Sequence, residues 1–448
     1  MKIKGDNIYF LGIGGIGMSA LARFFAAQGK QVEGYDKTPS PVTDGLMAEG
    51  IRVSFDDDPA TVERLPDMVV YTPAVPRDNK IFKYLLHKDV PFLKRSHALG
   101  IVTKDNFTIA VAGTHGKTTI TSLITHILKE EGFPVTGFVG GICNNYNSNL
   151  ILSENTEIIV VEADEFDRSF LTLYPDIAVI SSMDADHLDI YKDKKYLEES
   201  FFLFSRQIKE NGTLIIKEGL KTAADLKCKV RKFSYEQGGF AEASSLRVKD
   251  GKSSFILKAG DKEPVEIESI MPGKHNAENI SAAISACLAA GVKPEAAARA
   301  LRSYKGVKRR FDIRVQNSRH IYIDDYAHHP EEISATLSAV KSLFPEEKIT
   351  VIFQPHLYSR TRDFADDFAK SLSAADEVML MDIYPAREKP IEGINSRMLL
   401  DKISCRKKEL VDFDTVVEKI KAKKPRLLLT LGAGDIDRIV KEIEEVLS

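Results

Sequence analysis

The stretch Gly113-Thr-His-Gly-Lys-Thr-Thr119 decides how the rest of this chain is interpreted. It follows the apolar run Phe107 to Ala112, which is typical of a buried strand, and it precedes a segment from Ile120 to Glu131 with apolar residues at helical spacing. A strand, a glycine turn and a helix start bearing lysine and then hydroxyls form the layout of a phosphate-binding loop. Backbone N–H groups and Lys117 would face the phosphates there, and a threonine hydroxyl could hold a magnesium ion.

The loop differs from the common phosphate-binding pattern. Only two residues separate Gly113 from Gly116, whereas the common pattern has four between its glycines. An ordinary tight turn is the alternative interpretation, but lysine and two threonines at a helix start have little packing purpose. A helix dipole contributes only about 0.3 to 2 kcal/mol, so lysine and metal must carry most of the charge compensation.

The composition sets the broad class of the protein. The chain has 448 residues, 43% of them hydrophobic, which predicts about three domains at roughly 150 residues each. Its net charge of -3 gives no general attraction to nucleic acid or to an anionic membrane. No apolar run is long enough to span a membrane, and the first residues lead into a strand rather than a signal peptide, so a cytosolic protein is expected. Four widely separated cysteines are expected to be buried thiols, while the oligomeric state is not predicted.

Residues 1–104 are predicted to form a Rossmann-like domain. A short strand precedes Gly12-Ile-Gly-Gly-Ile-Gly17, an apolar helix follows, and a second strand ends at Asp36. This spacing matches a turn that binds pyrophosphate and an acid that binds a ribose hydroxyl. NAD and UDP-sugars share those features, and close helix packing would also explain the glycines, so the ligand stays open at this point.

Residues 105–308 are predicted to form a central domain around the phosphate-binding loop. Two further strands, 157–162 and 177–182, run into acidic loops, and Glu162 and His187 are expected to face a triphosphate as metal ligands. Acids after strands also begin turns and cap helices, which is the alternative for Asp164, Glu165 and Asp167. Residues 210–270 suggest a peripheral antiparallel sheet.

A helix beginning near residue 274 carries a polar group of a different kind. His275, Asn276 and Asn279 are expected on one face of its first turn, where they could contact the edge of a purine. Capping would explain one asparagine but not all three residues.

Residues 309–448 are predicted to form another doubly wound α/β domain. Four apolar strands each end in a polar loop. Arg360 and Arg362 follow the second of these strands and could bind phosphate or carboxylate, the alternative being solvated surface arginines.

Motifs along nearly the whole chain resemble the Mur ligase family. They are the 113–119 loop, Glu162-Ala-Asp-Glu165, Asp186-His-Leu-Asp189, His275-Asn-Ala-Glu-Asn279, Asp324-Asp-Tyr-Ala-His-His-Pro330 and the segment from Gln354 to Arg362. The resemblance implies an α/β fold of three domains: a Rossmann-like N-terminal domain, a central P-loop ATPase-like domain with a mostly parallel sheet, and a Rossmann-like C-terminal domain.

The resemblance also implies an activity. Mur ligases form amide bonds in peptidoglycan synthesis with ATP and Mg2+ through an acyl phosphate. The motifs are most similar to those of the members that join L-alanine to UDP-N-acetylmuramate, and the rival within the family attaches a whole peptide to the same sugar nucleotide. A rival of another class is an NAD-dependent oxidoreductase or nucleotide-sensing module built on the 12–17 turn.

Residue by residue, the resemblance implies three groups of contacts. ATP would contact Gly113, Thr114, His115, Gly116, Lys117, Thr118, Thr119, His275, Asn276, Asn279, Arg310 and Asp324. The UDP-sugar would contact Gly12, Gly14, Gly15, Gly17, Asp36, Thr72, Arg95 and His115. The amino acid or acyl phosphate would lie near Tyr326, His329, Arg360 and Arg362. Catalysis would depend on Lys117, Glu162, His187 and Arg360, with Thr118, Glu162 and His187 holding the metal. Several family members also use a carbamoylated lysine as a metal bridge, and no lysine is assigned that part here.

Overall fold

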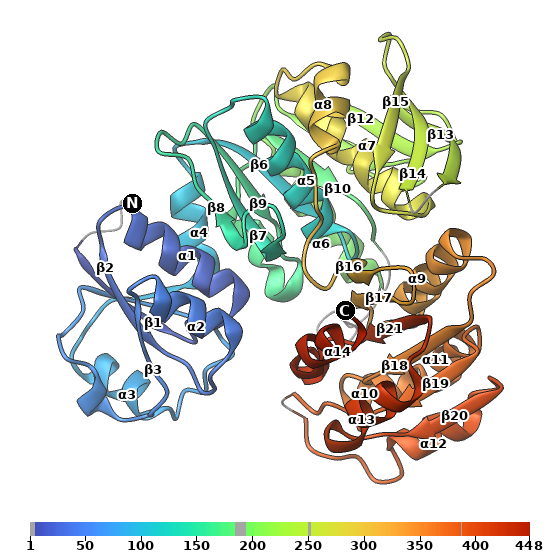
Figure 1. The fold of residues 1–448 in the computed structure, drawn as a ribbon. Helices are drawn as coiled ribbons and strands as arrows, with labels where there is room; N and C mark the ends of the chain where they lie inside the picture. Colours follow the sequence, from blue (N-terminus) through green and yellow to red (C-terminus); the bar gives the residue numbers. More distant parts are fainter. Residues whose placement is uncertain (1–4, 184–193, 250–251, 387) are drawn as a thin grey trace. The chain divides into compact units, whose positions relative to one another are not determined.

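The computed structural model describes residues 5–183, 194–249, 252–386 and 388–448. The chain divides into two compact units: residues 1–245, 256–267 and 278–304 form one, and residues 246–255, 268–277 and 305–448 form the other. The described strands form three sheets, of five, ten and six strands (Figure 1). The predicted α/β class with a mostly parallel central sheet is confirmed, whereas the domain boundaries at 104 and 308 stay a prediction.

The first sheet has the order β3-β2-β1-β4-β5, and all its pairings are parallel. Its strands are β1 (Asn7–Leu11), β2 (Gln31–Tyr35), β3 (Arg52–Ser54), β4 (Met68–Tyr71) and β5 (Phe92–Lys94). Its helical segments are α1 (Ile16–Ala27), α2 (Pro41–Ala48), η1 (Pro59–Thr61), α3 (Lys80–His87) and α4 (Arg95–Thr103). The order reverses at β1, as in a Rossmann-like sheet.

Alternating side chains of β1 explain why helices cover both faces of this sheet. Ile8 and Phe10 pack in one core with the apolar side of α1, whereas Tyr9 and Leu11 pack in another with α3. Successive side chains of a strand point to opposite faces. The carboxyl end of β1 therefore delivers the 12–17 glycine turn to the edge of the sheet.

The central sheet has the order β15-β14-β13-β12-β11-β10-β6-β9-β7-β8. Its strands are β6 (Phe107–Ala112), β7 (Val135–Cys143), β8 (Ser148–Ile151), β9 (Ile158–Glu162), β10 (Ile177–Ile180), β11 (Thr213–Lys217), β12 (Lys229–Tyr235), β13 (Ala241–Lys249), β14 (Lys252–Ala259) and β15 (Val265–Ser269). Its helical segments are α5 (Lys117–Glu130), η2 (Phe166–Thr172), α6 (Lys194–Arg206), α7 (Lys274–Ala289) and α8 (Pro294–Leu301). The prediction of a peripheral antiparallel sheet at 210–270 is wrong for β11 to β13, because β11 pairs in parallel with β10 and with β12, and β12 pairs in parallel with β13.

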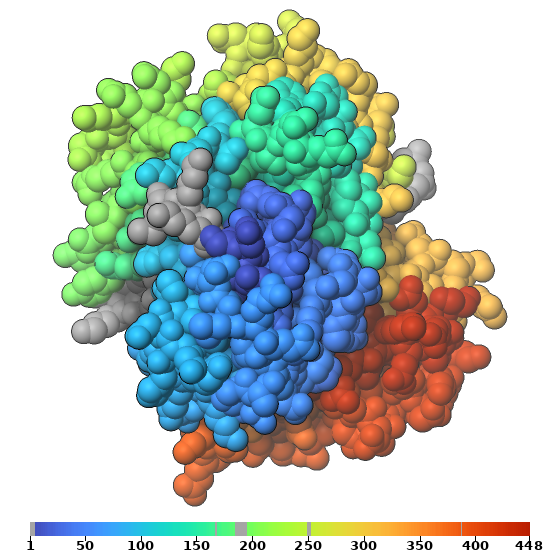
Figure 2. Space-filling model, turned by 90° about the vertical axis from the view of Figure 1, so that its left-hand side faces the viewer, coloured from blue at the N-terminus to red at the C-terminus, as the bar shows by residue number. Residues whose placement is uncertain are grey.

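One core joins the first sheet to the central sheet. The rings of Phe24 on α1 and Phe138 on β7 lie 5.3 Å apart. Arg23 donates to the Asn149 side chain at 2.6 Å, and buried Asn149 donates in turn to the Ile16 carbonyl at 2.6 Å. In the space-filling view the blue surface of the first sheet's residues adjoins the teal surface of β7 and β8 (Figure 2). Both sheets therefore belong to one compact unit.

The third sheet has the order β16-β17-β21-β18-β19-β20. Its strands are β16 (Asp312–Gln316), β17 (Ile321–Asp325), β18 (Ile349–Phe353), β19 (Glu377–Leu380), β20 (Lys407–Leu410) and β21 (Leu427–Leu431). Its helical segments are α9 (Pro330–Leu343), α10 (Tyr358–Asp363), α11 (Ala365–Leu372), α12 (Ser396–Lys402), α13 (Phe413–Lys423), η3 (Asp435–Ile439) and α14 (Val440–Leu447). Helices α9, α11 and α12 share a core with one face of this sheet, and α13 and α14 share a core with the other. The four predicted strands are present, with β16 and β20 added at the two edges.

Two expectations from composition can be compared with the structure. No helix in the described ranges combines the length and the apolar character that crossing a membrane requires. All four cysteines are free thiols: Cys143 and Cys287 are buried as expected, whereas Cys228 and Cys405 are partly exposed.

Candidate active site

The phosphate-binding loop joins β6 to α5 through two glycines with positive φ. Gly113 has φ +136° and Gly116 has φ +83°, a region that favours glycine. A side chain at Gly113 would collide with Ser181, and a Cβ at Gly116 would lie 2.6 Å from the Asn279 side-chain oxygen. Both positions therefore require glycine for its conformation and for its lack of a side chain.

The same loop is anchored to the end of the neighbouring strand β10. Ser182 Oγ lies 2.9 Å from Thr114 Oγ1 and accepts from the His115 N–H at 2.8 Å. Ser181 donates to the His115 carbonyl. Since β10 pairs in parallel with β6, both strands end at the same edge and can hold the loop between them.

Lys117 opens α5 and forms a buried ion pair. Its ammonium donates to the Gly113 carbonyl at 2.6 Å and to Glu165 Oε1 at 2.8 Å, and Glu165 is fully buried. Burial alone would lower the pKa of Lys117, but the carboxylates of Glu165 and Asp164 outweigh it and raise that pKa. Lys117 is thus held as a cation, and any phosphate that binds it competes with Glu165.

The residues predicted at the purine differ in exposure. His275 is exposed, Asn279 is half-buried beside Gly116, and Asn276 is buried with its amide donating to the Pro272 carbonyl at 2.8 Å. The structure therefore brings Asn279 to the phosphate-binding loop. The Asn276 amide stabilises the turn that precedes α7.

In the first sheet, the predicted sugar-nucleotide residues gather at the glycine turn. Asp36 accepts from the Gly14 N–H at 2.7 Å, and Thr72 packs against Gly12. The guanidinium of Arg95 lies against Gly17 and forms an ion pair with Asp164 at 3.1 Å. The interpretation of Asp164 and Glu165 as mere turn residues is therefore incomplete, because each pairs with a predicted ligand-binding cation.

At the third sheet, four aromatic rings from three loops form a continuous row of contacts. Tyr326 contacts His328 with ring centroids 5.2 Å apart, His328 contacts His356 at 5.9 Å, and His356 stacks on Tyr384 at 5.7 Å. Burial, with the nearby His328 and Arg360, lowers the pKa of His356 to about 4. His356 was not among the predicted site residues, although its place after a buried strand was a usable signal.

The remaining predicted residues of this sheet lie at strand ends and helix starts. His329 is the N-terminal cap of α9, with its ring 4.8 Å from that of Phe364. Arg360 is half-buried on α10, and exposed Arg362 pairs with Asp363 at 2.7 Å. All three residues follow the carboxyl ends of strands, His329 after β17 and the two arginines after β18.

Asp324, predicted to reach ATP, is buried on β17. Thr430 donates to its side chain at 2.6 Å, and burial raises the pKa of Asp324 to about 6 despite the nearby Arg309. Its neighbour Asp325 accepts from the backbone N–H groups of Phe311 and Ala327, both at 2.8 Å. Both carboxylates thus hold local structure at the end of β17.

Comparison with known protein families accounts for almost the whole chain. Residues 7–106 match the catalytic domain of the Mur ligase family, residues 111–287 match the Mur ligase middle domain, and residues 309–434 match the Mur ligase glutamate ligase domain. The chain belongs to the Mur ligase family.

Individual Mur ligases resemble the chain over its full length. It is 47% identical, over 98% of both chains, to UDP-N-acetylmuramate--L-alanine ligase of Flavobacterium psychrophilum. The crystal structure of UDP-N-acetylmuramate-alanine ligase MurC from Thermotoga maritima superposes with a TM-score of 0.86 at 28% identity, covering 98% of both chains. A murein peptide ligase from Psychrobacter arcticus shares the fold, with a TM-score of 0.74 at 23% identity over 99% of both chains.

Magnesium, which Mur ligases are expected to use, suits the oxygen donors of this chain. Glu162 ends β9 directly beside Val111 of β6, and its carboxylate accepts from the Gly140 N–H. Thr118 is buried in the first turn of α5. Magnesium commonly takes one or two protein oxygens together with substrate phosphates. No cluster of three metal-binding side chains occurs in the described ranges, and the predicted ligand His187 lies outside them.

Proposed function

We propose that this chain is an ATP-dependent ligase that joins L-alanine to the carboxylate of UDP-N-acetylmuramate in peptidoglycan precursor synthesis. The observation that carries the proposal is the 47% identity with a ligase of that name over 98% of both chains. The Lys117 loop adds the phosphate site that such a reaction needs. Because ATP and nucleotide sugars are cytoplasmic metabolites, we assign the reaction to the cytoplasm, where it would supply cell-wall growth and division.

The first step activates the sugar carboxylate. One carboxylate oxygen attacks the γ-phosphorus of ATP, a P–O bond forms, the bond to the bridging oxygen breaks, and ADP leaves. Lys117 would neutralise charge on the transferring phosphoryl group, after exchanging Glu165 for phosphate. Magnesium held by Thr118 and Glu162 would supply further charge neutralisation.

The second step forms the amide. The neutral amine of L-alanine attacks the carbonyl carbon of the acyl phosphate, the tetrahedral intermediate expels phosphate, and the nitrogen gives up one proton. Arg360 and Arg362 are proposed to bind the carboxylate of alanine or the phosphate, because a guanidinium fork suits either group. Tyr326 and His329 are proposed to border the same substrates.

The UDP-sugar is assigned to the 12–17 turn and the residues around it. We propose that its diphosphate meets the turn and the guanidinium of Arg95, which would have to exchange Asp164 for the ligand. His115, on the neighbouring loop, would face the sugar. An NAD-dependent oxidoreductase would use the same turn, but it would leave the Lys117–Glu165 arrangement without purpose.

Phosphate release tests the proposed function. The protein is incubated with ATP, magnesium and UDP-N-acetylmuramate, and then with L-alanine or a tripeptide. We expect release with alanine. Release only with the tripeptide would identify a peptide-recycling ligase, and no release together with tight NADH binding would refute the ligase altogether.

A further inference from the structure

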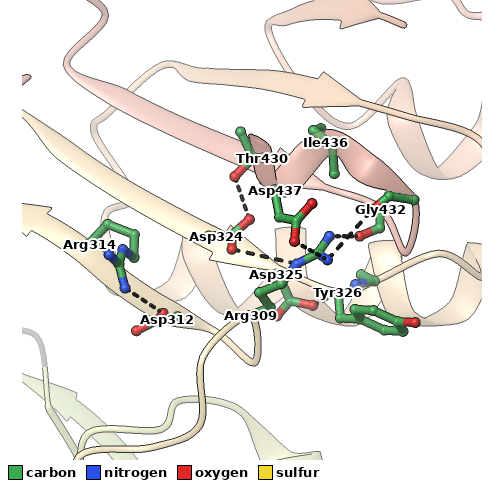
Figure 3. A network of polar contacts seen from close by, with 12 residues as sticks. Arg309, Asp312, Arg314, Asp324, Asp325, Tyr326, Thr430, Gly432, Ile436 and Asp437 are labelled. Atoms are coloured by element: carbon green, nitrogen blue, oxygen red, sulfur yellow. Dashed lines mark hydrogen bonds and ion pairs between the residues drawn. The ribbon is translucent and has the colours of Figure 1, made fainter. Parts of the chain in front are cut away.

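Arg309 lies at the centre of a polar network at the edge of the third sheet (Figure 3). Its backbone has φ +61°, and Phe311 two residues later has φ +49°. Such conformations are unfavourable for non-glycine residues and persist where the surrounding structure determines them. One such determinant is the Arg309 carbonyl, which accepts from the Tyr326 N–H at 2.7 Å.

The guanidinium of Arg309 holds the loop that follows β21. It donates to the Gly432 carbonyl at 2.6 Å and lies 3.5 Å from the Gly434 carbonyl. It also lies 3.8 Å from a carboxylate oxygen of Asp324 and 3.6 Å from one of Asp437. An arginine with most of its side chain buried is therefore used to fix a glycine loop rather than to meet solvent.

Gln354 fixes the opposite side of the same loop. Its amide nitrogen donates to Asp435 at 2.8 Å, and its amide oxygen accepts from the Ile436 N–H at 2.9 Å. A side chain at Gly434 would collide with Gln354 and would crowd Tyr384. The loop from Gly432 to Asp435 is consequently held by side chains from two other segments.

Arg309 also packs against the Tyr326 ring, which contacts Arg310, a predicted ATP ligand. The Arg309 guanidinium lies 5.1 Å from the centre of the Tyr326 ring, and that of Arg310 lies 4.9 Å from it. Guanidinium groups at such distances are attracted to the face of an aromatic ring. The position of Tyr326 therefore restricts where Arg310 can place its charge.

We propose that Arg309 is a positioning residue: it holds the glycine loop and the Tyr326 ring in one arrangement, and thereby orients Arg310 toward ATP. The identity of the Arg310 ligand rests on the proposed function. The arrangement itself rests only on the contacts of Arg309.

Arg309→Lys tests the proposal, with Arg314→Lys as the matched control. Lysine keeps the charge but cannot reach two carbonyls and the ring with one planar group. Arg314 is comparably buried, with 24% of its side chain exposed against 19% for Arg309, and pairs with Asp312 and Glu444 without contacting Tyr326 or the loop. We expect Arg309→Lys to lower kcat by about 10- to 100-fold with KM for the UDP-sugar changed less than about twofold, and Arg314→Lys to leave kcat within about twofold.

Hydrogen exchange supplies a measurement that does not depend on the reaction. Arg309→Lys should speed exchange at residues 326–329 and 432–436, and Arg314→Lys should not. The proposal is wrong if Arg309→Lys and Arg314→Lys lower the melting temperature by similar amounts and have equal kcat and equal exchange rates. Arg309 would then be merely structural. If Arg309→Lys fails to fold, Asp437→Asn replaces it as the test. The Asp437 side chain is 41% exposed, so this variant must show smaller changes of kcat and of exchange in the same direction. An inactive wild-type protein would refute the proposed function, whereas the exchange pattern would still decide the role of Arg309.

Discussion

At the scale of single residues, the pairing of Lys117 with Glu165 makes phosphate binding an exchange reaction. The carboxylate is fully buried and lies 2.8 Å from the ammonium, so a phosphate must replace a charge-assisted hydrogen bond rather than fill an empty position. The loop is thereby kept folded around its lysine. We assign Lys117 to the phosphates of ATP, since the sugar nucleotide is assigned to another glycine turn.

Substituting Lys117→Ala should abolish phosphate release and leave UDP-N-acetylmuramate binding within about threefold of wild type. Lys129→Ala is the control on the same helix, because Lys129 is near the other end of α5 and donates to the Leu152 carbonyl. Calorimetry with the UDP-sugar and a phosphate assay measure the two effects separately. Equal loss of both in Lys117→Ala would contradict the division into two sites.

The buried ring of His356 predicts a pH dependence of stability. Its pKa is about 4 in the folded protein, mainly through burial, against 6.5 for an ordinary histidine. The folded state therefore binds fewer protons than the unfolded state between these values, so the contribution of His356 to stability is complete above pH 6.5 and is lost as the pH falls toward 4.

His356→Phe keeps a ring against Tyr384 but cannot be protonated. Urea unfolding at about pH 7.5 and about pH 5 should show that wild type loses about 1 to 2 kcal/mol more free energy of unfolding than the variant, after allowing for the partial exposure of His356. Parallel losses in the two proteins would show that His356 does not titrate as inferred.

The sequence predicted the glycines and Lys117 because their spacing is local. It did not reveal the contacts of Glu165 or Arg309, because the importance of each depends on partners distant in the chain. Glu165 meets a lysine 48 residues earlier, and Arg309 meets a carbonyl 123 residues later. Such pairs become visible only when the fold brings them together.

At the scale of elements, α5 lies between two glycines that have similar φ angles but different surroundings. Comparing them distinguishes the effect of backbone strain from the effect of a steric contact. Gly116 at its N-terminal end has φ +83° and a neighbour that would lie 2.6 Å from an added Cβ, whereas Gly132 beyond its C-terminal end has φ +78° and open space around it. Alanine in this conformation costs about 1 to 2 kcal/mol from backbone strain alone.

Gly132→Ala should therefore lower the free energy of unfolding by about 1 to 2 kcal/mol and leave ATP turnover unchanged. Gly116→Ala should lose more stability and should also weaken ATP binding at least about tenfold, because Asn279 must move away from the loop. Urea melts and ATP titrations of the two variants give the comparison. The same loss of ATP affinity in both would show that strain, not the Asn279 contact, governs the loop.

Strands were predictable where burial makes them apolar on both faces. The strand Phe107–Ala112 has the predicted bounds, since parallel strands covered by helices form continuous apolar runs. Lys407–Leu410 was missed because an edge strand can carry charge. The antiparallel pairing predicted for β11 to β13 was wrong, because short apolar runs and turns do not encode strand direction.

At the scale of the whole molecule, three Mur ligase domains match the chain as predicted, while the first two sheets lie in one compact unit. The ranges 1–104 and 105–308 were predicted as separate domains, yet Phe24 and Phe138 pack across that division. A helix whose apolar side is covered by a second sheet looks the same in sequence as one covered by its own sheet. Sequence patterns therefore separated the sheets correctly but could not show which of them share a core.

The proposed reaction uses residues of both units on one set of substrates, which predicts a change of shape on binding. Lys117 belongs to the first unit and Arg310 to the second, and both are assigned to ATP. A ligand that contacts both units favours the arrangement in which it makes all of its contacts.

Small-angle scattering should therefore give a smaller radius of gyration when UDP-N-acetylmuramate and a non-hydrolysable ATP analogue are added together. UDP-N-acetylmuramate alone should change it less, because all its assigned contacts lie in the first unit. Lys117→Ala is the control, since it should bind the sugar nucleotide without completing the change. Profiles that do not respond to both nucleotides would mean that the two units need not move to react, and that the assignment of Arg310 to ATP must be reconsidered.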